Sequence, residues 1–280
     1  MASTSLLLAL GCKRRSGKNA GATAARPRVV SLSPNTTEAL FAVGAGNLVV
    51  GRSRFCDYPP GVEQIPSVGG YVDASLEAIL ALAPDWVVGA RGPAGPALAE
   101  KLGALGIATF FPPTESMAEI DAMITGLADK VGQAERGREI VLQLGRDRRA
   151  IEASVAEKPR VRTLMVFSIS PIVAAGPSSF CDEMIRLANG SNVVTSGGSY
   201  PTVSVERLVT MNPDVVLNAT MTAENADDVG PDRPGFAELR AVREGRVVPL
   251  KSDAVLRPGP RIAEGLRIVA RALHPTVQVP

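Results

Sequence analysis

The chain has 280 residues, of which 45% are hydrophobic, 21% are charged and 4% are aromatic. At roughly 150 residues per domain this length predicts two domains, and the composition excludes a largely disordered chain. The formal net charge of +2, without a basic run interleaved with aromatic residues, gives no case for nucleic-acid binding, and no apolar stretch reaches the ~20 residues that a membrane-spanning helix needs.

Residues 1–27 differ in kind from the rest of the chain. MASTSLLLALGC is a short apolar run that ends in small residues and Cys12, and a polar stretch rich in small residues follows. It resembles a bacterial lipoprotein signal, in which the cysteine is lipidated and becomes the new N-terminus. No Lys or Arg precedes the apolar run, although a secretory signal normally has one. A start upstream of Met1 would explain this, and the alternative is a buried or disordered N-terminal segment. On the lipoprotein interpretation, residues 13–27 form a flexible tether.

Residues 28–132 alternate short valine-rich runs with helical stretches, which predicts a parallel sheet covered by helices on both faces. The helix that starts at Leu76 is well delimited, because Ser75 suits its N-cap and Pro84 ends it. In chain order, the predicted strands are 28–32, 48–51, 86–90 and 108–111, and the predicted helices are 35–43, 76–83 and 96–105.

The alternation stops near residue 116. Ser116 and Glu119 form a capping box that opens one helix, and a second, longer helical stretch covers 134–157. The apolar residues of the longer helix share one stripe, with arginines and glutamates elsewhere. It could pack within one domain, but its place between two similar halves favours residues 133–159 as a connecting helix.

Alternation resumes after residue 160. The predicted strands are 162–168 and 246–250, and the predicted helices are 179–188, 236–242 and 259–273. Between them, SVERLVTMNPDVVL (204–217) repeats SLEAILALAPDWVV (75–88). Generic strand–helix patterns share caps and Pro stops, but not a match of this length. The predicted fold class is therefore α/β, with two related Rossmann-like lobes, 28–132 and 160–280, whose parallel sheets are joined by a long helix.

Enzyme signatures are scarce in this sequence. The sequence contains one histidine, His274, which gives little basis for a catalytic triad or a histidine metal cluster. No Gly-x-Ser-x-Gly elbow occurs. No catalytic residue and no metal site are predicted, which favours a binding protein over an enzyme. Cys56 and Cys181 could pair in an oxidising compartment or be two buried small residues, and the second alternative is slightly favoured.

A resemblance to a known family rests on five stretches. They are VVSLSPNTTEALFAVGAG, CDYPP with the VGGY that follows, SLEAILALAPDWVV, SVERLVTMNPDVV and SDAVLRPGPRI. Together they resemble the periplasmic substrate-binding proteins of ABC importers that carry cobalamin, haem and ferric siderophores, and most closely the cobalamin-binding class. The resemblance covers nearly all of residues 28–273. It implies a ligand cleft between the lobes and a monomeric periplasmic receptor, anchored through a lipid on Cys12, that serves a permease dimer in the inner membrane.

The same resemblance implies roles for single residues. One glutamate per lobe, Glu77 and Glu206, would dock on arginines of the two permease subunits. A glutamate in the first turn of a helix is also favoured by the helix dipole, but its presence at the same place in both repeats favours docking. The ligand-binding positions of the cobalamin pattern fall on Phe55, Tyr71, Tyr200, Asp253 and Arg257. Aromatic faces suit a flat macrocycle, while Asp253 and Arg257 could bond its amides or pair with each other.

The ligand implied is cobalamin, with haem or a ferric siderophore as the alternatives, and no other cofactor is expected. The tryptophans of the cobalamin pattern appear here as Tyr71 and Tyr200, either of which could also serve as an axial haem ligand. A ferric siderophore would call for more cationic side chains than Arg257, with Arg52, Arg54 and Arg91 as the further candidates. The rival from another class is a chelatase-like enzyme on a similar two-lobe scaffold.

Overall fold

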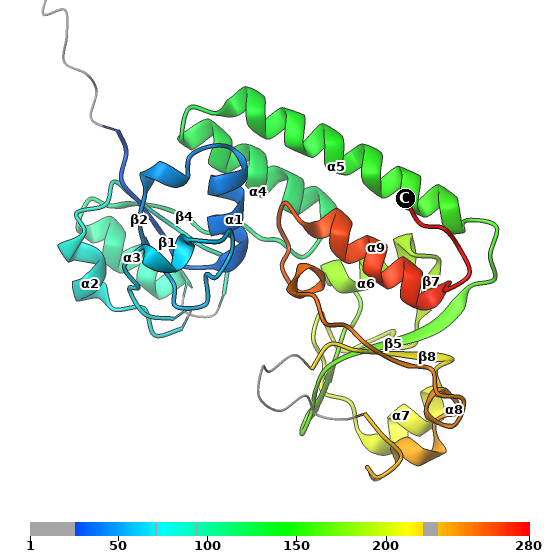
Figure 1. Ribbon diagram of the computed structural model, residues 1–280. Coiled ribbons are helices and arrows are strands. Elements are labelled where there is room, and N and C mark those ends of the chain that lie inside the picture. Colours follow the sequence, from blue (N-terminus) through cyan, green and yellow to red (C-terminus); the bar gives the residue numbers. More distant parts are fainter. Residues whose placement is uncertain (1–25, 71, 93–94, 221–228, 234) are drawn as a thin grey trace, which may run out of the picture.

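A computed structural model describes residues 26–70, 72–92, 95–220, 229–233 and 235–280. These residues form two α/β lobes that are bridged by two long helices, α4 (Met117–Lys130) and α5 (Ala134–Val155), as Figure 1 shows. The predicted fold class is thus confirmed. Cys12 and Tyr71 lie outside the described residues. Within them, no helix combines the length and the apolar composition needed to cross a bilayer.

The N-terminal lobe is built on a parallel sheet with the strand order β2–β1–β3–β4. Its valines at 29, 30, 87 and 88 are buried, as expected where helices cover both faces of a sheet. The strands are β1 (Val29–Ser31), β2 (Val49–Arg52), β3 (Trp86–Val88) and β4 (Ala108–Phe110), and the helices are α1 (Pro34–Ala42), α2 (Leu76–Ala81) and α3 (Gly95–Ala104), with short 3-10 turns at Gly46–Leu48 and Val62–Gln64.

The C-terminal lobe is built around the long strand β5 (Val161–Ile169), in a sheet of order β6–β5–β8–β9 with β7 also paired to β5. Its other elements are β6 (Ile172–Ala174), β7 (Gly190–Asn192), β8 (Val215–Asn218), β9 (Val247–Pro249), α6 (Phe180–Leu187), α7 (Val205–Met211), α8 (Arg240–Arg243) and α9 (Ile262–Leu273). Strands β6 and β7 were not predicted. Strand β6 runs antiparallel to β5, because the two-residue link between them is too short for a parallel crossover.

Two helices of this lobe differ from the prediction. The stretch 236–242 is a 3-10 turn (Phe236–Glu238) followed by α8, because Leu239 between them is extended and fully buried. Helix α9 begins at Ile262 instead of residue 259. Gly259 precedes Pro260, and the residue before a proline is disfavoured in the helical region.

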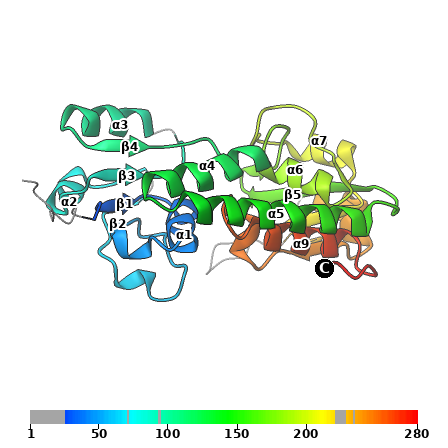
Figure 2. The ribbon, with the colours of Figure 1, turned by 90° about the horizontal axis from the view of Figure 1, so that it is seen from above.

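The link between the lobes begins at the predicted N-cap Ser116, but the reciprocal bond of the predicted capping box is shifted by one residue, since the Glu119 side chain bonds Glu115 and not Ser116. Ser116 Oγ accepts the backbone N–H of Glu119 at 3.2 Å, while the Glu119 carboxylate accepts the N–H of Glu115 at 2.8 Å. Glu183 of α6 accepts the N–H of Met117 at 2.7 Å, so the start of α4 is bonded to the C-terminal lobe. From there α4 runs to the N-terminal lobe and α5 runs back beside it to the C-terminal lobe (Figure 2), so that the connector contains both helices and not residues 133–159 alone.

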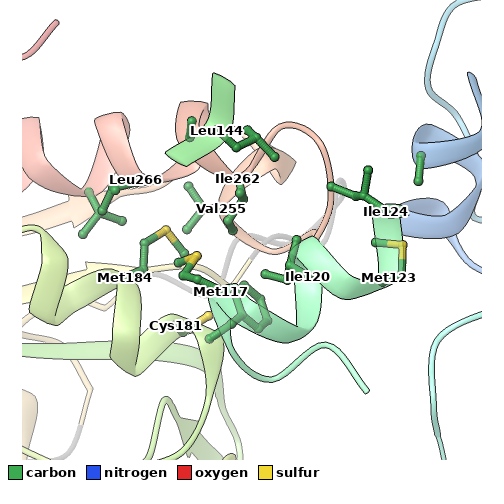
Figure 3. Packing of buried hydrophobic residues seen from close by; sticks show 14 of the residues in the cluster. Met117, Ile120, Met123, Ile124, Leu144, Cys181, Met184, Val255, Ile262 and Leu266 are labelled. Atoms are coloured by element: carbon green, nitrogen blue, oxygen red, sulfur yellow. The ribbon is translucent and has the colours of Figure 1, made fainter. Parts of the chain in front are cut away.

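A continuous apolar core runs along this connector. Arg148 of α5 and Asp121 of α4 form a largely buried ion pair (2.5 Å) that holds the two helices together. Beneath them, residues of α4, α5, α6 and α9 pack in one cluster, including Ile120, Ile124, Leu144, Met184 and Leu266 (Figure 3). Since a wide hinge motion would expose part of this core, the packing favours lobes that move little relative to each other.

His274, at the end of α9, gives the fold a pH-dependent term. The residue is buried, and its Nε2 lies 3.1 Å from the carbonyl oxygen of Ala188. Burial lowers the pKa of His274 below its usual value of 6.5. Because this base is harder to protonate in the folded state, its stabilising effect is complete above about pH 6.5 and is lost as the pH falls through the lowered pKa.

We therefore expect a smaller free energy of unfolding in urea at about pH 5.5 than at about pH 7.5, and a weaker pH dependence in His274→Gln. An identical pH dependence in the two proteins would show that other groups are responsible.

Candidate ligand site and docking faces

The repeated sequence stretch folds into the same helix start in both lobes. Ser75 precedes α2, and its hydroxyl accepts the N–H of Ala78 at 3.2 Å. Ser204 precedes α7, and its hydroxyl accepts the N–H of Arg207 at 3.3 Å. The predicted N-caps are therefore confirmed, and each satisfies one of the unpaired donors of a helix start.

An exposed glutamate stands in the first turn of each of these helices. Glu77 lies on α2 and Glu206 on α7, one per lobe and well apart in Figure 1. A backbone N–H and then the hydroxyl of Ser204 lower the pKa of Glu206, so that its carboxylate is fully charged at neutral pH. The two lobes thus present one solvent-exposed glutamate each.

The Pro-Asp part of the repeat has a structural role. Asp85 accepts the N–H of Arg28 at 2.8 Å, and its own N–H donates to the Arg28 carbonyl at 2.9 Å. Asp214 and Arg162 make the same reciprocal pair in the other lobe, at 3.3 and 2.8 Å. These bonds fasten the start of one strand to its neighbour. The aspartates are therefore used by the fold, whereas the exposed glutamates remain available to a partner.

Two of the predicted ligand-binding aromatic residues are exposed on loops that follow strands. Phe55 comes after β2 and is 54% exposed, and Tyr200 comes after β7 and is 43% exposed. The ring of Tyr200 packs edge-to-face on Phe167 of β5, with the ring centroids 5.7 Å apart. Phe167 was not among the predicted residues, although an aromatic residue near the carboxyl end of a predicted strand is a usable signal.

The hydroxyl of Tyr200 is already engaged. It donates to Glu115 Oε2 at 2.7 Å, which ties this loop of the C-terminal lobe to the segment before α4. Burial, together with the Glu115 carboxylate, raises the pKa of Tyr200 far above its ordinary value. The phenol is therefore protonated at physiological pH in the protein without ligand.

The other two predicted ligand residues belong to a group of charges that bridges the lobes. Asp253 and Arg257 pair with each other at 2.8 Å. Arg257 also forms a two-pronged bond with Asp57 of the N-terminal lobe, at 2.6 and 2.9 Å, and it reaches Glu38 of α1 at 3.1 Å. The pKa of Asp57 is lowered chiefly by its hydrogen bond from Arg257.

Arg261 completes this interlobe ion cluster, which we define as Glu38, Asp57, Asp253, Arg257 and Arg261. Its guanidinium donates to Glu38 at 2.7 and 2.9 Å and to Asp253 at 3.0 Å, and it faces the ring of Tyr58 at 4.2 Å. Only 2% of the Glu38 side chain is exposed. Sequence reasoning missed Glu38, Asp57 and Arg261, although a glutamate inside the buried stretch of α1 is itself a signal of a buried partner.

The cluster is not a cationic receptor. Among the described side chains it joins three carboxylates to two guanidinium groups, so its net charge is −1 when all are ionised. Arg54 is paired with Asp73 at 2.7 Å, and Arg52 donates to backbone carbonyls. Three of the arginines considered for an anionic chelate are thus already bonded.

The cysteines and acidic groups give no sign of redox or metal chemistry in the described part of the chain. Cys56 and Cys181 are both free and buried, so the expectation that they are unpaired is confirmed. Thr37 Oγ1 donates to the Cys56 sulfur at 3.1 Å, and burial raises the pKa of both thiols. The described residues contain no group of His, Cys, Asp and Glu arranged to hold a metal ion.

Residues 29–254 match the family model described as periplasmic binding protein. The chain belongs to this family. A vitamin B12-binding protein of Vibrio parahaemolyticus is 31% identical over 238 residues, which cover 84% of each chain. One from Salmonella typhimurium is 30% identical over 250 residues, covering 89% of this chain and 91% of the relative.

Solved structures of this periplasmic binding protein family superimpose closely. The periplasmic vitamin B12 binding protein BtuF of Vibrio cholerae has a TM-score of 0.76 at 28% identity, covering 88% of this chain and 96% of BtuF. The periplasmic haem-binding protein RhuT from Roseiflexus sp. RS-1 has a TM-score of 0.77 at 28% identity, covering 89% of this chain and 98% of RhuT. The same fold therefore serves relatives named for two different macrocycles, and both are binding proteins.

Proposed function

We propose that this protein is the substrate-binding component of an ABC importer, and that it captures cobalamin, or a corrinoid like it, and delivers it to the permease in the inner membrane. The observation that carries the proposal is the ~30% identity to vitamin B12-binding proteins over more than four fifths of the chain. The chemistry is non-covalent, and ATP is used by other subunits of the importer.

The ligand would be held by loops from both lobes. Phe55 offers an exposed ring from the N-terminal lobe, and Tyr200 with Phe167 offers an aromatic pair from the C-terminal lobe. Ring stacking adds about 0.5–1.5 kcal/mol per contact beyond the burial of area. Asp253 and Arg257 of the interlobe ion cluster would supply hydrogen-bond partners for amide groups at the rim of a corrinoid.

Haem is the second candidate, because haem-binding proteins are among the similar structures. The described residues support it less well. The hydroxyl of Tyr200 already donates to Glu115, so ligation of iron at this residue would break that bond. Arg54 and Arg257 are already paired with carboxylates, so neither offers an unpaired positive charge to a propionate. A neutral, amide-bearing macrocycle fits these residues better.

As a periplasmic binding protein, the chain acts in the periplasm beside an importer. We further propose that a lipid on Cys12 anchors it to a membrane and that it works as a monomer. Docking on the permease would use Glu77 and Glu206, one per lobe, because two charges fixed on a rigid body set the register on a partner with two similar halves.

The proposal is tested by titrating protein that lacks residues 1–27 with cobalamin, with haem and with a panel of ferric siderophores, followed by absorbance. We expect saturable binding of cobalamin with a Kd below about 1 μM and an approximately tenfold loss in Phe55→Ala, because a stacked ring is removed.

The matched control for this titration is Leu105→Ala. Leu105 is also 54% exposed, but it follows α3 and makes no part of the proposed site. Binding of haem or a siderophore in place of cobalamin would overturn the ligand assignment while keeping the fold. No binding of any of these ligands would favour the chelatase-like enzyme.

A further inference from the structure

Asp57 occupies the outer edge of the interlobe ion cluster. Its side chain is 65% exposed, against 14% for Arg257 and 2% for Glu38. It lies on the loop after β2, between Phe55 and Tyr58, which are 54% and 41% exposed. The carboxylate of Asp57 is therefore the most exposed acidic group of the cluster, and it lies on the same loop as Phe55 of the proposed site.

The bond that Asp57 makes is the one a carboxylate ligand would need. Its two oxygens accept from Nη1 and Nη2 of Arg257, at 2.6 and 2.9 Å. This two-nitrogen edge of a guanidinium is the geometry in which arginine recognises carboxylates, including those of ligands. Glu38 and Asp253 contact Nη1 as well, but no other described group is bonded to Nη2 of Arg257. Without Asp57, Nη2 of Arg257 would lose its partner, while Nη1 would stay bonded to Glu38 and Asp253.

Asp57 also decides the sign of the local charge. With it, the three carboxylates of the cluster outnumber the two guanidinium groups, and without it they balance. Like charges brought together at a binding surface are a strong source of discrimination between ligands. An incoming carboxylate would meet both an occupied arginine and a net negative cluster.

We infer that Asp57 is a specificity-determining residue, which excludes ligands that carry carboxylate groups by occupying Arg257 and keeping the cluster negative. The inference rests on the proposed function, since it assumes that the ligand binds between the loops of the two lobes. A corrinoid with amide side chains is admitted, because it brings no carboxylate to compete for Arg257. A porphyrin with two propionates is rejected.

The test is Asp57→Asn in the full chain, titrated with haem and with cobalamin. Asparagine keeps the shape of the side chain and removes its charge. We expect the Kd for haem to fall about tenfold and the Kd for cobalamin to stay within about twofold, and we expect the gain for haem to shrink at high salt. Asp57→Ser should also lower the Kd for haem. Agreement between the two variants would show that the effect does not come from a structural defect of one substitution.

The matched control is Glu139→Gln on α5. It removes the same charge from a 58% exposed carboxylate that is also paired with an arginine, Arg136, but away from the interlobe ion cluster. An unchanged ratio of haem to cobalamin affinity in Asp57→Asn, or an equal change in Glu139→Gln, would overturn the inference. Failure of the unaltered protein to bind cobalamin would instead overturn the proposed function, and the haem titrations of the variants would still decide the role of Asp57.

Discussion

The double variant Glu77→Ala/Glu206→Ala is expected to bind its ligand with unchanged affinity and to lose the ability to stimulate the importer. Both side chains are exposed, so their removal leaves no buried group without a partner. Each would pair with a cation of the permease, and losing one half of such an interfacial pair costs about 2–5 kcal/mol. Two losses together should reduce stimulation of ATP hydrolysis by more than about a hundredfold at a fixed concentration of binding protein.

The measurement is ATP hydrolysis by the reconstituted importer, titrated with loaded binding protein. The matched control is Glu100→Ala/Glu152→Ala, which removes two exposed glutamates from α3 and α5. The single variants should each show a partial loss, because each would leave one lobe docked. Full stimulation by the double variant would contradict the docking role, and the glutamates would then be explained by the helix dipole alone.

The order of helices and strands could be predicted because each element carries a local signal. Ser75, Ser116 and Ser204 are N-caps whose hydroxyls accept the bonds that the sequence pattern implies. Strands β6 and β7 carry a weaker signal, although β6 contains the β-branched pair Ile172 and Val173. They are three residues long, and the sequence of β7, Gly-Ser-Asn, lacks the β-branched residues that indicate a strand. Both form only because β5 offers an edge to pair with.

The candidate site was predictable only in part, for a related reason. Asp253 and Arg257 are four positions apart, so their pairing could be considered from the sequence alone. The contacts of Glu38 with Arg257 and Arg261 join residues more than 200 positions apart, and local pattern carries no information about such pairs. Tertiary packing sets these distances. The interlobe ion cluster therefore could not be predicted from the sequence, because its residues meet only through the packing of the two lobes.

Glu38→Ala is expected to destabilise the protein by about 3–5 kcal/mol, because it leaves two largely buried guanidinium groups without their shared countercharge. Glu38 accepts from Arg261 at 2.7 and 2.9 Å and from Arg257 at 3.1 Å. Arg257 and Arg261 are only 14% and 17% exposed, so water cannot replace the lost carboxylate fully. The free energy of unfolding in urea measures this loss.

The ranking of three variants distinguishes a buried anchor from an exposed contact in the same cluster. Glu38→Gln keeps the volume but not the charge, so it should cost less than Glu38→Ala and still more than about 1 kcal/mol. Asp57→Asn should cost less than about 1 kcal/mol, since that carboxylate is 65% exposed and its loss is largely compensated by water. If all three variants lost equally little, the apolar core along α4 and α5 would be sufficient to hold the lobes together. A large loss confined to Glu38 would instead identify its bonds to Arg257 and Arg261 as the fixed link between the lobes.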